Sequence, residues 1–177
     1  ETGRELTFSH LSPAPEKKKI LVIGGGPAGM KATAVAASRG HSVKLIEATS
    51  KLGGQVNLAE RLPGRSEFGG ITTNLENMLR MQDVEIKLNT EASLQLIRAE
   101  APEVIILATG GKSFEPKIEG KESAHVVTAW QLLEGKANVG SRVVIADWRC
   151  DWVGLGVAEL LARQGCHVRL ACNGMGP

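Results

Sequence analysis

This sequence has few cysteines, a small net charge and no long apolar run. Three cysteines occur in 177 residues, at Cys150, Cys166 and Cys172, and they form neither a C-x-x-C pair nor a metal-ligand spacing. A sparse and odd set is typical of reduced thiols, so we expect a cytoplasmic chain without a disulfide framework. Cys166 and Cys172 flank or lie on an apolar strand, and we predict that both are buried structural thiols.

The histidines and the overall charge exclude further classes of function. The four histidines are scattered and lack clustered carboxylates, so we predict no metal site and no catalytic nucleophile–base pair. A net charge of +2 gives no electrostatic case for a nucleic-acid partner or an anionic membrane. No apolar run approaches the roughly 18 residues of a membrane helix, and residues 1–19 lack the apolar core of a signal peptide. We therefore expect no nucleic-acid partner and no membrane partner.

What the sequence does contain is the composition and periodicity of a globular α/β chain. Hydrophobic residues make up 42% and charged residues 23%, which are ordinary values for a folded domain. Short β-branched runs alternate with segments of helix length, as in βαβ units with a parallel sheet. The predicted strands are 19–24, 42–47, 84–88, 90–93, 103–110, 125–128, 142–147 and 166–171, and the predicted helices are 27–39, 71–82, 93–99, 129–134 and 153–164.

These elements predict an α/β fold. We expect a Rossmann-like domain with a parallel sheet, followed by part of a second βαβ unit. Pro13 and Pro15, with weak periodicity around them, indicate a linker or tail. A βαβ pair is too small to complete a parallel sheet, so we expect the second unit to be incomplete. The predicted parts are 1–18 (linker or tail), 19–112 (Rossmann-like part), 113–139 (connecting segment) and 140–177 (second βαβ unit).

The first βαβ unit carries a glycine-rich turn with the spacing G-x-G-x-x-G, made by Gly24, Gly26 and Gly29. Gly24 permits a tight turn, Gly26 lets the backbone approach a pyrophosphate, and Gly29 lets helix and strand pack closely. The N–H groups and partial positive charge of the following helix then face the anion. A purely structural glycine turn is the alternative interpretation.

An acid at the end of the second predicted strand strengthens the prediction of a nucleotide site. Glu47 lies 18 residues after Gly29, close to the spacing of about 20 expected for the acid that binds the ribose. Its carboxylate can accept hydrogen bonds from the 2′- and 3′-hydroxyls, and it would repel a 2′-phosphate, which disfavours NADP at this site. The alternative is a solvated acid beside a structural turn.

Four segments and Glu47 together carry a resemblance to a known family. The segments are ILVIGGGPAGMKA (20–32), LGGQVNLAERLPGRSEFGGI (52–71), VIILATG (104–110) and VVTAWQLLEGKANVGSRVVI (126–145). They are similar to the two-dinucleotide-binding flavoproteins, and more closely to the C-terminal domains of the large NADH:flavin oxidoreductases related to old yellow enzyme. That group includes 2,4-dienoyl-CoA reductase, trimethylamine dehydrogenase and amine demethylases. The resemblance implies a Rossmann-like FAD/NAD(P)-binding domain, with an FAD- or ADP-binding part at 19–112 and a second NAD(P)-like βαβ unit at 140–177.

The resemblance implies a set of cofactor-binding residues. Arg65 is the least secure of them, because it could equally be a surface arginine in a P-G-R turn. The resemblance assigns Gly24, Gly26, Pro27, Ala28 and Gly29 to the pyrophosphate, Glu47 to the ribose with Ala48 beside it, Gln55 and Arg65 to the nucleotide, Ala92 to the adenine through its backbone, and Gly54, Ala108, Thr109 and Gly110 to the flavin side.

The second βαβ unit has the outline of another nucleotide-binding turn without its glycines. Gly154 matches the last glycine of such a turn, but the two earlier glycines are absent and the segment 146–153 is longer than usual. Two tryptophans would crowd a pyrophosphate, and Asp147 and Asp151 would repel it. We therefore predict that the NAD(P)H site is degraded. In the resembling family, trimethylamine dehydrogenase also departs from the glycine pattern here and carries ADP rather than FAD in the first site. Alternatively, the loop formed by residues 148–152 only packs against a neighbouring domain.

The leading hypothesis is an FAD-binding, or alternatively ADP-binding, domain of a larger flavin-dependent oxidoreductase. The resemblance implies electron transfer to or from an FMN-binding barrel with an iron–sulfur cluster, both expected only in the parent enzyme. This fragment alone would then be catalytically incomplete and would contain no catalytic residue. The departure at the second turn favours an amine dehydrogenase or demethylase.

Two other hypotheses remain beside this one. A disulfide reductase-like flavoprotein would require a redox C-x-x-C pair. A non-redox module that binds an adenine nucleotide would use the same glycine turn and the same Glu47.

Overall fold

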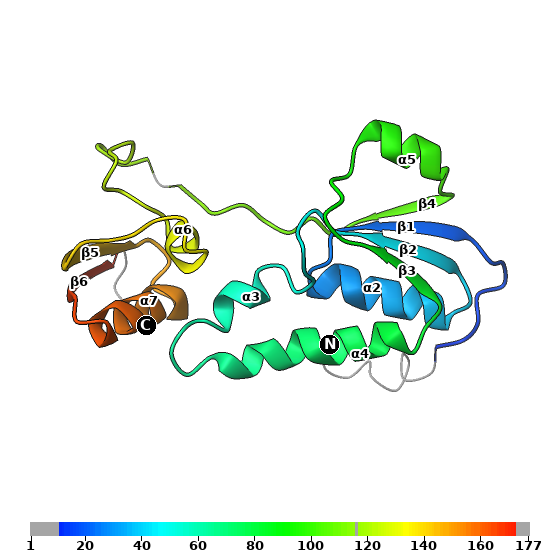
Figure 1. Cartoon of the computed structure of the whole chain (residues 1–177), viewed down its shortest axis with the longest axis horizontal. Coiled ribbons are helices and arrows are strands. Elements are labelled where there is room, and N and C mark those ends of the chain that lie inside the picture. The colour runs from blue at the N-terminus through cyan, green and yellow to red at the C-terminus, as the bar shows by residue number, and fades with distance from the viewer. Residues whose placement is uncertain (1–10, 116, 173–177) are drawn as a thin grey trace. The chain divides into compact units, whose positions relative to one another are not determined.

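The structure is a computed structural model that describes residues 11–115 and 117–172 (Figure 1). These residues divide into two compact units, the first made of 11–56 with 69–110 and the second of 57–68 with the described residues after 110. Three parts of the sequence-based predictions lie outside the described residues: the start of the predicted tail (1–10), Pro116 of the predicted connecting segment, and the end of the predicted second unit (173–177).

The first unit is built on a four-stranded parallel sheet whose strand order is β3-β2-β1-β4. The chain runs outward from β1 to β2 and β3, and then returns to place β4 on the other side of β1. β1 is therefore central, and its residues Ile20–Ile23 are all buried. The strands are β1 (Lys19–Ile23), β2 (Ser42–Ile46), β3 (Val84–Lys87) and β4 (Val104–Leu107).

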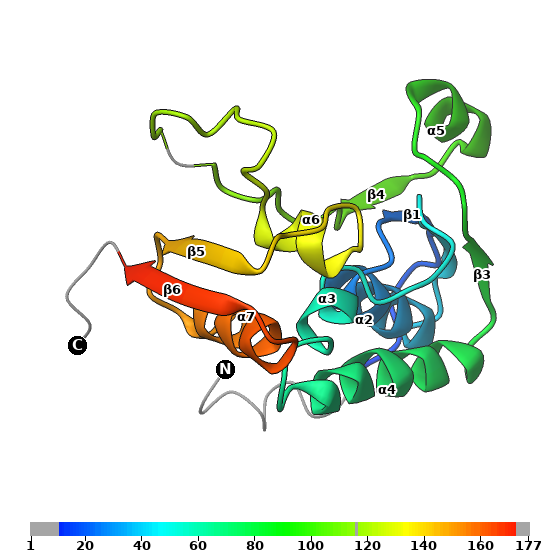
Figure 2. The same cartoon turned by 60° about the vertical axis from the view of Figure 1, so that its left-hand side comes forward.

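Helices cover both faces of this sheet, as Figures 1 and 2 show. On one face α2 (Pro27–Ser38) and α4 (Gly69–Arg80) pack over the alternate strand residues that include Val22 and Leu45. On the other face α5 (Leu94–Glu100) packs over Leu21 and its neighbours. The sequence thus buries both faces of the central strands, which explains their uninterrupted apolar runs.

The second unit contains a smaller parallel pair, β5 (Arg142–Asp147) and β6 (His167–Cys172), joined by α7 (Trp152–Arg163). Figure 2 shows the two strands side by side with α7 against them. Leu133, Val157 and Leu161 form its buried core with Leu62 from the segment 57–68. Its other elements are most of α3 (Val56–Ala59), a single 3-10 turn (Ser66–Phe68) and α6 (Ala129–Leu133).

Two predicted strands were wrong. Residues 90–93 are not a strand, because Thr90 makes one backbone hydrogen bond to Glu47 (2.9 Å) and Ser93 already caps α5. Residues 125–128 are not a strand either, because Thr128 forms a capping box that begins α6. In both places the side chain that caps the following helix ends the extended segment.

The expectation that both cysteines are buried also needs correction. Cys172 is exposed rather than buried, since it ends a strand of a two-stranded sheet that has one open face; Cys166 is partly buried. In α4, Leu75 and Leu79 are buried, whereas Ile71, in the first turn, is 41% exposed. Within the described residues, none of the helices has the length and apolar character needed to cross a bilayer.

Candidate functional site

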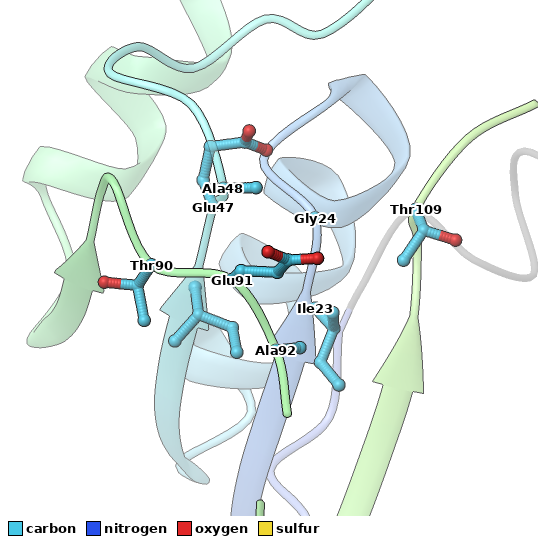
Figure 3. A pocket seen from close by; sticks show the side chains of 9 residues that line it. Ile23, Gly24, Glu47, Ala48, Thr90, Glu91, Ala92 and Thr109 are labelled. Carbon is cyan, nitrogen blue, oxygen red and sulfur yellow. The ribbon is translucent and has the colours of Figure 1, made fainter. Parts of the chain in front are cut away.

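A pocket of about 290 Å³ opens at the carboxyl ends of the parallel strands in the first unit (Figure 3). Open α/β sheets bind ligands at this edge, at the point where the strand order reverses. Here that point lies between β1 and β4. The pocket is lined by Ile23 and Gly24 at the end of β1, Ile46, Glu47 and Ala48 at the end of β2, Thr90, Glu91 and Ala92 after β3, and Thr109 after β4.

The glycine turn beside the pocket is closely packed at two of its three motif glycines. A Cβ added to Gly24 would overlap the carbonyl of Ala108, and one added to Gly29 would overlap the carbonyl of Gly24. Gly24 also has φ 109°, which side chains rarely adopt. In contrast, a Cβ on Gly26 would meet nothing within 4 Å. The space above Gly26 is therefore the part of the turn that is open to a ligand.

The first turn of α2 presents backbone donors to this open space. Gly26 is the N-cap residue and provides no side-chain cap, and Pro27 occupies the first helical position. An uncapped helix start leaves N–H groups that can donate hydrogen bonds to an anion. The backbone of Gly53 donates to the carbonyl of Gly25 (2.9 Å), which brings Gly54 against Gly26. These residues form a cradle that fits a pyrophosphate.

Glu47 links the glycine turn to the pocket. Its Oε2 accepts a hydrogen bond from the Gly25 N–H (2.6 Å), and its Oε1 accepts from the N–H and hydroxyl of Thr49 (both 2.7 Å). Burial raises the pKa of the Glu47 carboxyl, but hydrogen bonds from Thr49, Gly25 and Ala48 outweigh that effect and lower it. Glu47 is therefore a carboxylate at neutral pH, and it is held rigidly at the pocket wall.

The structure brings most of the predicted cofactor-binding residues together in the first unit. Ala108 donates its backbone N–H to Ile23 (2.8 Å), which holds the predicted flavin-side segment against β1. A Cβ on Gly110 would lie 3.3 Å from Nε2 of Gln55, so those two positions are also neighbours. Gly24, Glu47, Ala48, Ala92 and Thr109 line the pocket, and Gly26, Pro27, Ala28, Gly29 and Gly54 surround the start of α2.

Arg65 is the predicted residue that belongs to the second unit. Its guanidinium lies over the ring of Trp152 (4.9 Å to the centroid) and near the ring of Phe68 (5.8 Å). The two rings are themselves 5.7 Å apart. These contacts are cation–π and aromatic contacts, which hold the segment 57–68 on α7.

Four residues that line the pocket were not predicted as site residues from the sequence: Ile23, Ile46, Thr90 and Glu91. Thr49, which contacts Glu47, was not predicted either. Thr49 fixes the carboxylate of Glu47, and Thr90 and Glu91 form the pocket wall after β3. Figure 3 shows Thr90, Glu91 and Ala92 on one segment that passes the ends of β1 and β2. A signal was available for Thr90 and Glu91, because residues after each parallel strand gather at the same edge of the sheet.

The second turn, between β5 and α7, is filled by the chain's own carboxylate. Oδ1 of Asp147 accepts hydrogen bonds from the N–H groups of Arg149 (3.1 Å) and Cys150 (2.9 Å). Oδ2 is buried against Gly154 and has no hydrogen-bond donor within the described residues. Asp151 caps α7 by accepting from the N–H of Val153 (2.9 Å). Two acidic side chains therefore occupy the place where a helix start would meet an anion.

Groups of three or more His, Cys, Asp or Glu side chains that could hold a metal ion do not occur in the described part of the chain.

Comparisons with known proteins agree with this geometry. Over 167 residues the chain is 37% identical to N,N-dimethylglycine/sarcosine dehydrogenase of Chromohalobacter salexigens, covering 91% of this chain and 24% of that protein. It is 40% identical over 158 residues to bilirubin reductase of Mediterraneibacter gnavus, covering 89% of this chain and 24% of the reductase. The solved structure of 6-hydroxypseudooxynicotine amine oxidase from Pseudomonas geniculata superposes with a TM-score of 0.89 at 29% identity, covering 99% of this chain and 28% of that one.

The chain thus spans about a quarter of the length of the curated relatives it matches. Those relatives are flavin oxidoreductases of the kind that the sequence motifs resemble, so that prediction is confirmed, as is the Rossmann-like α/β fold. The family profile described as pyridine nucleotide-disulphide oxidoreductase matches residues 18–171. The chain belongs to the pyridine nucleotide-disulphide oxidoreductase family and corresponds to an FAD/NAD(P)-binding domain of that family.

Proposed function

We propose that the pocket of the first unit binds the adenosine diphosphate part of FAD, or ADP itself. The observation that carries this proposal is the open space above Gly26, next to the uncapped start of α2 and the fixed carboxylate of Glu47. Pyrophosphate would accept from the N–H groups of the turn, and Glu47 would accept from the ribose hydroxyls. Ala92, after β3, would lie against the adenine.

The size and charge of the pocket support the nucleotide half of FAD at this position. Its volume of about 290 Å³ is at the lower end of ligand pockets, which are about 300–1,000 Å³. Two acids, Glu47 and Glu91, line it, so a 2′-phosphate would meet repulsion and NADP is disfavoured. The flavin half of FAD would extend past Ala108–Gly110 and Gln55, the side to which the family motifs assign it.

Bound FAD would supply two-electron redox chemistry, while this chain's residues bind and orient it. In the longer parent enzyme, the domain would pass electrons to or from an FMN-binding barrel with an iron–sulfur cluster. Among the relatives are N,N-dimethylglycine/sarcosine dehydrogenase and an amine oxidase. We therefore favour oxidation or demethylation of a secondary or tertiary amine by a cytoplasmic parent enzyme. With ADP in place of FAD, the domain would be a structural nucleotide holder.

The second turn would not bind NAD(P)H. Asp147 places its carboxylate against Gly154, where the pyrophosphate would approach the start of α7. A second anion at this position would be repelled by Asp147 and Asp151 at close range. Electrons would consequently enter or leave through the parent enzyme rather than through a nicotinamide at this turn. If FAD is bound, NADH added under anaerobic conditions should leave it oxidised; rapid bleaching would overturn this part of the proposal.

The nucleotide itself is identified by mass spectrometry of the material released from the purified, denatured chain. FAD supports the electron-carrying role, and ADP supports the structural role. Calorimetric titration of nucleotide-free protein then tests the site. We expect ADP to bind more tightly than its 2′-phosphorylated analogue.

The variant Glu47→Ala should weaken ADP binding more than about tenfold, which is about 1.4 kcal/mol, and should remove the preference over the analogue. Glu76→Ala is the matched control and should bind normally, since Glu76 is a partly exposed residue of α4 that pairs with Arg80. Equal binding of both nucleotides by the unaltered chain, or normal ADP binding by Glu47→Ala, would refute the proposed ribose contact.

A further inference from the structure

Two cysteines distant in sequence meet at the carboxyl end of the β5–β6 pair. The parallel register of these strands places Cys172 opposite Asp147, and paired Cα atoms on neighbouring strands are about 5 Å apart. After Asp147 the chain turns back on itself. The N–H of Cys150 donates to Oδ1 of Asp147 (2.9 Å), and Sγ of Cys150 lies 4.0 Å from the carbonyl oxygen of Asp147. Both thiols are therefore next to the same residue.

Burial raises the pKa of the Cys172 thiol, and the neighbouring side chains of Cys150 and Asp147 raise it further. The same three residues therefore influence one another at this end of the strand pair. Cys172 is exposed and Cys150 is partly exposed. A small reagent in solution can thus reach the pair.

The backbone of the turn holds Cys150 in an uncommon conformation. Its φ is 53°, in the left-handed region that residues other than glycine rarely adopt. Asp147 maintains this conformation by accepting hydrogen bonds from both Arg149 and Cys150. Backbone strain of this kind tends to occur where the chain orients a side chain for a purpose. Here it accompanies a thiol that lies beside a second thiol.

We propose that Cys150 and Cys172 are a redox-active pair that forms a reversible disulfide at the second turn, with a low-molecular-weight disulfide as the oxidant. One protein thiolate attacks the small disulfide, giving a mixed disulfide and releasing one small thiol. The second protein thiolate then attacks the protein sulfur of the mixed disulfide and releases the other small thiol. The two protein protons end on the two small thiols, so the protein loses two hydrogens and two electrons, and the small disulfide gains them.

The bond would fasten the turn after β5 to the end of β6. The turn also carries Asp147 and the N-cap Asp151 of α7, so oxidation fixes the segment that fills the second nucleotide position. Cys166 does not take part. Its thiol faces the carbonyl of Gly140 (3.6 Å) and packs against the core of the second unit at the opposite end of β6.

The sequence allows a direct test, because trypsin places each cysteine in its own peptide. Cleavage after Arg149, Arg163 and Arg169 gives peptides 150–163, 164–169 and 170–177. The full chain is incubated with a series of glutathione redox buffers, trapped with acid and an alkylating agent, and digested without reduction. We expect peptide 150–163 linked to peptide 170–177, two hydrogens lighter than the two thiol peptides together, and released by reductant.

Variants of the three cysteines distinguish this pair from general thiol oxidation. Cys166→Ser should keep the 150–172 link at the same buffer ratio. Cys172→Ser should lose the link and leave a glutathione adduct on Cys150, and Cys150→Ser should leave the adduct on Cys172. A link that involves Cys166, separate glutathione adducts on both members of the pair in the unaltered chain, or alkylated thiols throughout the buffer series would each overturn the proposal.

Discussion

The carboxylate of Asp147 lies against Gly154, in the space that a side chain on Gly154 would need. Asp147 is 7% exposed, and its Oδ1 accepts from two backbone N–H groups of the turn. The Asp147 carboxylate thus leaves no room for a side chain at position 154, whereas the space around Gly26 in the first turn is open. The same strand–turn–helix pattern is open to an anion in one unit and filled in the other.

This contact predicts a coupling between the two positions. Gly154→Ala should destabilise the chain by about 1–3 kcal/mol, because the added Cβ overlaps the Asp147 carboxylate. In the Asp147→Ala background, Gly154→Ala should lower the free energy of unfolding by much less. Chemical unfolding of the unaltered chain, the two single variants and the double variant measures the difference. Gly70→Ala in α4 is the control, since its Cβ would meet nothing within 4 Å. Equal costs of Gly154→Ala in both backgrounds would show that the contact is unimportant.

Removing the internal carboxylate should make the second turn sensitive to added anions. Asp147→Ala leaves the N–H groups of Arg149 and Cys150 without their acceptor, at a cost of about 1–3 kcal/mol. Inorganic phosphate should then raise the Tm of Asp147→Ala more than that of the unaltered chain. Potassium chloride at the same ionic strength is the control for general salt effects. If phosphate raises the Tm of the two proteins equally, the Asp147 carboxylate does not occupy an anion-binding position.

Substitutions of Gly26 and Gly29 in the first turn should affect different properties, nucleotide affinity at Gly26 and stability at Gly29. Gly26→Ala should cost less than about 1 kcal/mol of stability, as a change at an N-cap with free space, but weaken ADP binding more than about tenfold. Gly29→Ala should destabilise the fold by about 1–3 kcal/mol or more, because its Cβ overlaps the Gly24 carbonyl. Thermal unfolding and calorimetric titration measure both effects. Normal ADP affinity of Gly26→Ala would contradict the proposed pyrophosphate position.

Glu47 should make the stability of the chain depend on pH at the acidic end. Its folded-state pKa lies below the ordinary value of 4.5, so the native state binds fewer protons than the unfolded state in that range. Its stabilising contribution is therefore fully present above about pH 5.5, and is lost as pH falls through the folded-state pKa. Urea unfolding at a series of pH values should show this loss, and it should be smaller in Glu47→Gln. A parallel decline in both proteins would assign the effect to other carboxyls.

The sequence alone determined the parts of this protein that depend on local backbone requirements. The glycine spacing, the apolar strands and Glu47 at the end of β2 specified a Rossmann-like α/β unit, because each acts through neighbouring backbone or through the two-faced burial of a parallel strand. It also indicated that the turn at Asp147 lacks the glycines of a nucleotide site. It did not specify the short segments, where capping by Ser93 and Thr128 replaced two predicted strands.

Tertiary structure decided which distant segments come together. Thr90 and Glu91 join the pocket because β3 lies beside β2, and Arg65 belongs to the second unit because it stacks on Trp152. The burial of Asp147 and the meeting of Cys150 with Cys172 likewise depend on the pairing of β5 with β6. For Thr90 and Glu91 the available signal was their position after a parallel strand. The contacts of Arg65, Asp147 and the two cysteines result from packing between distant segments, and no local pattern of residue types encodes them.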